Sequence, residues 1–366
     1  MDEIEALNSA TSIINAVIKR AVEIGASDIH CDPRESHIEI LFRIDGIIEP
    51  TVRLKRMFLD EIISRLKILA GVRTDVHVVP QDGRWSTKVG DELFNIRVSF
   101  MPTYHGENAV MRLLKARANS DVSLASLGFT IEHASAITKA LKKTHGLILV
   151  TGPTGSGKTT TLHACLLQKV SEPLTIITLE DPVEYDIPGI RQVHISSAHG
   201  VSFASGLRAA LRQDPDVIMV GEIRDVETAH VAIHTSLTGH LVLSTLHTNS
   251  ALEAIVRLND MGIDRYLLAS TVTLVIAQRL IRTQCRLCYS AGCESCRHTG
   301  FVGRSVIAEV LELDSHLKEL ITKGKSQKVM NSYLFEKNFK TLHDDGDEKV
   351  EWGLTTREEV LRVLNT

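Results

Sequence analysis

Apolar residues near the start of the chain follow two different spacings. Over residues 10–24 they return at helical intervals, which predicts an amphipathic helix that Gly25 can end. From Ile38 to Ile44 every second residue is apolar, which predicts a half-buried strand, and Asp45–Gly46 predicts a hairpin turn after it. The chain is therefore expected to begin with a helix and a hairpin.

The same two patterns continue to residue 115. Residues 59–70 have helical spacing, and residues 83–89 and 93–100 read as two strands joined by a turn near Gly90. We therefore expect a small α+β domain over residues 1–115. The next segment, residues 116–126, is rich in small and polar residues and is the expected linker.

Beyond this linker, over residues 127–366, apolar runs alternate with helical patterns, as the strands and helices of a parallel sheet do. The expected strands are residues 146–150, 174–178, 217–220 and 241–244, and each is followed by a polar cluster. Ligands bind outside the carboxyl ends of the strands in open α/β sheets, so the four clusters should converge on one site. The fold class of this part is α/β.

Composition excludes several classes of protein. The chain has 366 residues, of which 43% are hydrophobic and 23% charged, enough for an ordinary buried core and two domains. No apolar run is long enough to span a bilayer, and the N-terminus has no secretory pattern, so a cytoplasmic protein is expected. A net charge of −4 gives no reason to expect a basic, nucleic-acid-binding surface over the whole chain, although it does not rule out a local basic groove.

A glycine-rich stretch after the first expected strand of the sheet matches the phosphate-binding pattern G-x-x-x-x-G-K-[ST]. Its backbone N–H groups would cradle the β- and γ-phosphates of a nucleotide, Lys158 would add a point charge, and Thr159 would ligate Mg²⁺. The alternative is a glycine-rich turn without a ligand. The expected nucleotide-binding residues are Gly152, Pro153, Thr154, Gly155, Ser156, Gly157, Lys158, Thr159 and Thr160.

Two carboxylates and two histidines follow the later strands. Glu180 and Glu222 are the best placed to orient or deprotonate water and to add charge near the metal, although either could be a helix cap or a surface ion-pair partner. His240 and His247 flank the last expected strand. They could sense the γ-phosphate, and a purely structural role is an equal alternative on spacing alone.

Four of the six cysteines form the pattern C-x2-C-x4-C-x2-C: Cys285, Cys288, Cys293 and Cys296. In a protein without an export signal this spacing predicts a tetrahedral Zn²⁺ site rather than disulfides. The alternative is a redox-active or merely exposed cluster of thiols. The zinc-binding lobe is expected over residues 282–299, where Gly292 would help the short connection to turn.

These motifs together resemble those of the secretion ATPases that power type II secretion and type IV pilus assembly. The shared stretches occur in the family's order and cover nearly the whole chain: residues 26–33 (ASDIHCDP), 96–114 (IRVSFMPTYHGENAVMRLL), 152–159, 178–185 (TLEDPVEY), 207–249 and 292–304 (GCESCRHTGFVGR).

The resemblance implies a RecA-like core with a parallel-rich sheet, a PAS-like N-terminal α+β domain and a helical C-terminal part over residues 310–366. It implies that Glu180 is the general base and that Glu222 is the Walker B carboxylate, acting through Mg²⁺ and water. His240 and His247 fall in the family's histidine box. Arg97 and Arg112 match arginines that reach the nucleotide phosphates; without the family both would read as ordinary surface charges.

The function implied is a Mg²⁺-dependent ATPase that forms a homo-oligomeric ring, expected to be a hexamer, and acts through an inner-membrane platform protein to assemble a pilus or pseudopilus. It would lie peripherally at the cytoplasmic face of the inner membrane. The chain starts almost at the ASDIH stretch, so a minimal motor is expected. The two cysteine pairs are closer together than is common in the family, so a truncated zinc lobe is expected as well. Pilus retraction, a RecA-like nucleic-acid translocase and a scaffold that binds ATP without turnover are the alternatives.

Overall fold

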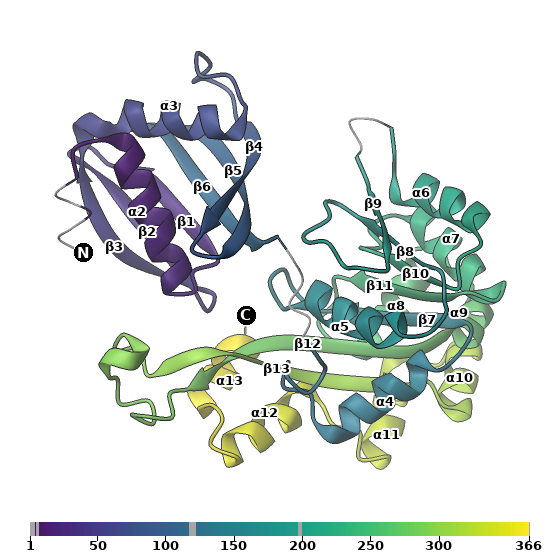
Figure 1. Cartoon of the computed structure of the whole chain (residues 1–366). Coiled ribbons are helices and arrows are strands. Elements are labelled where there is room, and N and C mark those ends of the chain that lie inside the picture. Colours follow the sequence, from purple (N-terminus) through teal and green to yellow (C-terminus); the bar gives the residue numbers. More distant parts are fainter. Residues whose placement is uncertain (1–3, 5–6, 117–121, 197–199, 366) are drawn as a thin grey trace. The chain divides into compact units, whose positions relative to one another are not determined.

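The chain folds as two compact units in the computed structural model of Figure 1. Residue 4 and residues 7–116, 122–196 and 200–365 are described. One unit consists of residues 1–118 with 184–186, and the other of residues 119–183 with 187–366. Within the described part of the chain, none of the helices combines the length and the hydropathy that crossing a membrane requires.

The first unit is a six-stranded antiparallel sheet in the order β3-β2-β1-β6-β5-β4. Its elements are α2 (Ala10–Glu23), β1 (Asp28–Pro33), β2 (His37–Ile44), β3 (Ile47–Lys55), η1 (Arg56–Phe58), α3 (Leu59–Ala70), β4 (Gln81–Val89), β5 (Glu92–Thr103) and β6 (Gly106–Lys115). Alternate strand residues such as Phe42 and Phe100 are buried against Ile13 of α2 and Ile63 of α3. Both helices therefore cover one face of the sheet.

The expected elements of the first unit are confirmed. The first helix ends at Glu23 with Ile24 as its C-cap, and Gly25 follows with a left-handed φ of 70°. The second helix has the expected bounds, Leu59–Ala70. The α+β architecture is therefore correct, whereas the PAS-like relationship implied by the resemblance stays a prediction.

The second unit contains a seven-stranded sheet in the order β13-β12-β7-β11-β10-β8-β9, in which only the edge strand β13 pairs antiparallel. The strands are β7 (Gly146–Thr151), β8 (Ile176–Glu180), β9 (Arg191–His194), β10 (Val217–Val220), β11 (Leu241–Leu246), β12 (Val272–Gln284) and β13 (Phe301–Glu312). The predicted parallel core is confirmed, with β8 beginning two residues later than expected.

Helices cover both faces of this sheet. Ile137 of α4 and Leu166 of α5 belong to one core cluster, and Ile233 of α7 and Leu268 of α9 belong to the other. The helices are α4 (Ile131–Leu141), α5 (Lys158–Val170), α6 (Phe203–Ala210), η3 (Leu211–Gln213), α7 (Val226–Leu237), α8 (Ala251–Asp260), α9 (Arg265–Thr271), η4 (Glu294–Cys296), α10 (Ser315–Thr322), α11 (Gln327–Glu336), α12 (Leu342–Glu351) and α13 (Arg357–Leu364).

Two expected boundaries differ from the structure. Residues 117–121 of the expected linker lie outside the described residues, and Leu124, inside the same segment, is buried in the core of the second unit. Residues 122–126 are therefore part of that unit rather than a linker. The helical C-terminal part was expected from residue 310, but β13 continues to Glu312 and the first of the four C-terminal helices begins at Ser315.

Candidate active site

The phosphate loop, residues 152–159, connects buried strand β7 to helix α5. Gly157 is the residue before the helix and has a left-handed φ of 85°, a conformation that favours glycine. A Cβ at Gly152 would lie 2.5 Å from the carbonyl oxygen of Gln278, so the loop packs directly on β12. The first N–H groups of α5, including that of Thr159, are those that a helix N-terminus offers to an anion.

The side chain of Lys158 folds back onto the phosphate loop. Its Nζ donates to the carbonyl oxygens of Gly152 and Pro153, each at 2.9 Å, and the side chain is buried. Burial, together with the nearby Arg279 guanidinium, lowers the pKa of Lys158 to about 8, and the carboxylate of Glu222 opposes this shift. The ammonium is therefore held near Glu222 at the end of the sheet.

Glu222 forms the centre of a charged cluster at the carboxyl ends of β10 and β11. Its Oε2 lies 2.5 Å from Nε of Arg224 and 3.6 Å from Nε2 of His247. Burial and the positive charge of Lys158 lower the pKa of His247, while Glu222 acts in the opposite direction. The structure thus brings Lys158, Glu222 and His247 together, as the convergence of strand ends predicts.

Glu180 is the last residue of β8, the strand next to β10. Its carboxylate is buried and accepts hydrogen bonds from Thr178 and Gln192, and it faces His163 of helix α5. Glu180 and Glu222 therefore follow adjacent parallel strands, but the contacts of Glu180 lie on the side of the sheet that α5 covers.

His240 does not join this cluster. It precedes β11, whereas His247 follows it, and the strands β7, β11 and β10 are parallel. At about 3.3 Å per residue the two histidines are roughly 20 Å apart, at opposite ends of strand β11. Nδ1 of His240 lies 3.2 Å from the carbonyl oxygen of Thr235, which is a local structural contact.

Arg97 and Arg112 belong to the first unit and are directly opposite each other on β5 and β6. Their neighbours in the strands, such as Ile96 and Met111, are buried, so both arginines lie on the face that the helices leave uncovered. Nε of Arg112 donates to Oδ1 of Asp28 at 2.9 Å. These two arginines belong to the first unit, whereas the phosphate loop belongs to the second.

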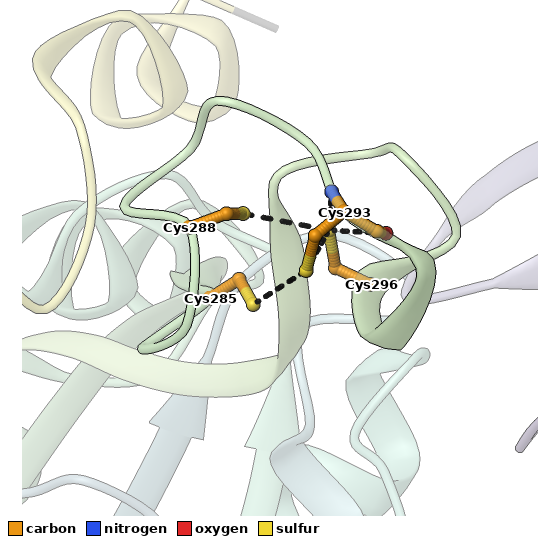
Figure 2. Close-up of side chains that lie close together, drawn as sticks. All are labelled: Cys285, Cys288, Cys293 and Cys296. Carbon is orange, nitrogen blue, oxygen red and sulfur yellow. Dashed lines mark hydrogen bonds between the residues drawn. The ribbon is translucent and has the colours of Figure 1, made fainter.

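The four cysteines lie in the loop between β12 and β13, as Figure 2 shows. Their sulfur atoms all lie within 4.8 Å of one another, and the Sγ–Sγ distances are 3.9 Å for Cys285–Cys293 and 3.7 Å for both Cys288–Cys296 and Cys293–Cys296. A tetrahedron of sulfurs around Zn²⁺ at about 2.3 Å has edges of about 3.8 Å. The donor set therefore fits a zinc ion.

The backbone of this loop favours the thiolate of Cys296. Backbone N–H groups of Cys293 and Gly300 donate to Sγ of Cys296. Burial raises the pKa of Cys296, but these donors outweigh it and lower the pKa to about 6. Gly292, expected to assist the turn, has a φ of 88°, and a Cβ there would lie 2.9 Å from the carbonyl oxygen of His298.

Sequence reasoning missed two residues at the nucleotide site. Arg224 contacts Glu222, and a cation two residues after a strand-end carboxylate was a signal available in the sequence. Gln278 is fully buried, and its Nε2 donates to the carbonyl oxygen of Ser156 at 2.7 Å, which ties the phosphate loop to β12. That contact joins residues far apart in the chain and has no local signal.

Comparison with known proteins identifies similar chains over nearly the full length. The family model described as Type II/IV secretion system protein matches residues 3–362. The Type II secretion system ATPase E of Vibrio cholerae is 44% identical over 96% of this chain and 74% of its own length. The Type II secretion system protein HxcR of Pseudomonas aeruginosa is 42% identical over 96% of this chain and 76% of its own length.

Solved structures give the same picture of the fold. The pilus retraction motor PilT with bound ADP superposes with a TM-score of 0.70 at 30% identity, covering 95% of this chain and 96% of that one. The ATPase DotB of Legionella pneumophila superposes with a TM-score of 0.75 at 21% identity, covering 97% and 95%, and supports the fold alone. The fold class, an α/β core of the type found in these ATPases, is confirmed.

Proposed function

The chain belongs to the Type II/IV secretion system protein family and is an ATPase of that family, and we propose that it drives the assembly of a pilus or pseudopilus. The cluster of Lys158, Glu222 and His247 at adjacent strand ends carries this proposal, because a motor must hydrolyse nucleotide. An intact charged site of this kind argues against a scaffold that only binds ATP.

The chain's own residues have separate roles in hydrolysis. The N–H groups of residues 154–159 and the Lys158 ammonium hold the β- and γ-phosphates. Mg²⁺, ligated by Thr159, would neutralise charge on the phosphate oxygens when bound. Glu222 would orient the water around that site, and His247, whose Nε2 lies 3.6 Å from Oε2 of Glu222, would sense the γ-phosphate.

Glu180 acts as the general base in this proposal. The water oxygen bonds to the γ-phosphorus while the bond between that phosphorus and the bridging oxygen of ADP breaks, and the water proton passes to the Glu180 carboxylate. Arg97 and Arg112 stabilise the charge that develops on the phosphate oxygens. Since both arginines belong to the first unit, rotation of that unit relative to the core would couple hydrolysis to movement.

The assembly that fits this scheme is a homo-oligomeric ring, which we propose to be a hexamer. Its partner would be an inner-membrane platform protein, reached at the cytoplasmic face of the membrane. Zn²⁺ bound by the four cysteines would be structural, since four thiolates complete its coordination and leave no position for water. The lobe would then provide part of the surface that contacts the platform.

Retraction is the second candidate, because PilT, a retraction motor, is 30% identical over 95% of this chain. Assembly is favoured because the relatives at 44% and 42% identity are type II secretion proteins. Counting surface filaments in host cells that carry Glu222→Gln separates the two. Loss of an assembly motor should leave cells without filaments, whereas loss of a retraction motor should leave filaments longer or more numerous, an outcome that would overturn the assembly proposal.

A further inference from the structure

The carboxylate of Glu180 is enclosed by polar groups from three elements. Oε1 accepts hydrogen bonds from Oγ1 of Thr178 in β8 at 2.6 Å and from Nε2 of Gln192 in β9 at 3.0 Å. The third element is α5, whose residue His163 faces the other oxygen of the carboxylate. The first oxygen of the carboxylate is therefore fixed by neutral donors.

The second oxygen faces a histidine. Oε2 of Glu180 lies 3.5 Å from Nε2 of His163, and the two residues are 3% and 1% exposed. His163 belongs to α5, the helix that begins at Lys158 of the phosphate loop, about one and a half turns further along. A buried imidazole and a buried carboxylate that face each other at this distance interact strongly, because water does not screen them.

This contact affects the protonation of Glu180. Burial raises the pKa of the Glu180 carboxyl, but the contacts from His163, Gln192 and Thr178 outweigh it and hold the pKa below its ordinary value. A base must be ionised to accept a proton. Removing the N–H of His163 should therefore raise the pKa of Glu180 and reduce the ionised fraction on the acidic side of the pH range.

We propose that His163 is the positioning residue of the general base: its Nε2, 3.5 Å from Oε2 of Glu180, donates to that oxygen during hydrolysis and ties the orientation of the carboxylate to the phosphate-loop helix. This inference rests on the proposed role of Glu180 in hydrolysis. The ring links the loop that holds the phosphates to the carboxylate that receives the proton of water. Contacts of this type tighten when substrate binds, so an interaction at 3.5 Å is compatible with the role.

Two substitutions of similar size separate positioning from packing. His163→Gln keeps an N–H donor near the position of Nε2, whereas His163→Leu removes it and keeps the bulk. For His163→Leu we expect kcat for ATP to fall at least about tenfold, the size of effect expected for a hydrogen bond to a charged group. The ATP Kd should stay within about twofold, and the acidic limb of the kcat–pH profile should move to higher pH.

His163→Gln should keep kcat within about threefold of the wild-type value and leave the acidic limb in place. His163→Met, a flexible apolar replacement, substitutes for the leucine variant if that variant does not fold. A folded leucine or methionine variant with wild-type kcat and an unmoved acidic limb would overturn the inference. So would a glutamine variant as slow as the leucine one.

Glu180→Gln in the same full-length protein distinguishes this inference from the proposed function. If Glu180→Gln keeps wild-type turnover, Glu180 is not the base and the proposed function itself is wrong at this residue. If Glu180→Gln is inactive while the His163 variants behave as the wild type, only the inference fails. The double variant Glu180→Gln, His163→Leu should be no slower than Glu180→Gln alone, because the histidine acts through that carboxylate.

Discussion

Single residues of the phosphate loop have the clearest consequences for nucleotide binding. Lys158 is the charge nearest the loop carbonyls, so Lys158→Ala should weaken ATP binding itself, raising the Kd at least about tenfold. The exposed Lys142, at the end of α4, is a suitable control, and Lys142→Ala should leave the Kd unchanged. Titration with a fluorescent ATP analogue measures both. Equal affinities for the two variants would contradict the role of Lys158.

Residues of the site were predictable where their signal is local. The phosphate loop and Glu222 belong to short motifs next to an apolar strand, and the structure places them together. His240 was grouped with His247 because both flank one strand, although they lie at opposite ends of it. Contacts such as that of His163 with Glu180 could not be predicted from spacing, because they depend on how helix α5 packs on the sheet.

At the scale of elements, cysteine substitutions test whether a metal ion orders the loop between β12 and β13. Cys288→Ser or Cys293→Ser should disorder residues 285–300 and release zinc, because structural Zn²⁺ contributes on the order of 10 kcal/mol to ordering such a loop. ATP hydrolysis should largely survive. Elemental analysis and limited proteolysis measure the two effects, with Arg286→Ala, an exposed position in the same loop, as the control.

The zinc content of the wild-type protein tests the metal prediction directly. Wild-type protein purified without chelator, with its thiols reduced, should carry about one zinc per chain. A content well below one would mean that the cysteine cluster does not bind the metal. A serine variant that keeps both its zinc and its resistance to protease would contradict the assignment of that cysteine as a ligand.

A buried carboxylate joins the base of the same hairpin to the last helix. Glu359 of α13 lies 2.8 Å from Nη2 of Arg282 in β12 and 2.6 Å from Nη2 of Arg362. Burial raises the pKa of Glu359, but these two arginines outweigh it and hold the pKa at about 2. The carboxylate therefore stabilises the fold when it is ionised.

Glu359→Gln should lower the free energy of unfolding by about 3 kcal/mol at pH 7. The folded-state pKa is lowered, so the stabilisation is present above the ordinary carboxyl pKa and is lost as the pH falls from about 4.5 toward 2. Urea unfolding of both proteins across this range should show the difference shrinking. Glu351→Gln, at an exposed site on α12, is the control, and a difference independent of pH would contradict the account.

The bounds of helices and strands were predicted well where apolar residues recur at a clear period, and less well where apolar residues form a continuous run. Helix α3 has the predicted bounds, because its apolar residues form one stripe. Strand β8 was placed two residues early, because the turn signal at Pro173 set its expected start, whereas the strand begins at Ile176, after Leu174 and Thr175. The pairing of β12 with both β7 and β13 was not predicted, since its first eight residues are all buried and have no alternation that indicates its partners.

At the scale of the whole molecule, substitution of the two arginines in the first unit tests whether ATP hydrolysis needs both units. In full-length protein, Arg97→Ala or Arg112→Ala should lower kcat by about a thousandfold, as removal of an arginine that contacts the transferred phosphate does in other nucleotide hydrolases. Lys88→Ala, a cation on β4 of the same sheet, should retain wild-type activity. Arginine variants that keep full activity would confine catalysis to the second unit.

The division into an N-terminal α+β part and a parallel-sheet core could be predicted, because each has its own periodicity and its own buried core. The proposed ring could not be predicted in this way, because periodicity identifies the buried core of each unit and not the contacts between chains. For the same reason the arginines were assigned to the nucleotide by family resemblance, whereas their strands alone indicated surface charges.

We propose that this chain hydrolyses ATP at the site formed by the strand ends around Glu222. Phosphate release by purified Glu222→Gln, measured beside wild-type protein and the exposed Glu227→Gln, tests it most directly. We expect Glu222→Gln to bind ATP with near-normal affinity and to turn it over at least about a hundredfold more slowly, with Glu227→Gln unaffected. Turnover of Glu222→Gln at the wild-type rate would contradict the account.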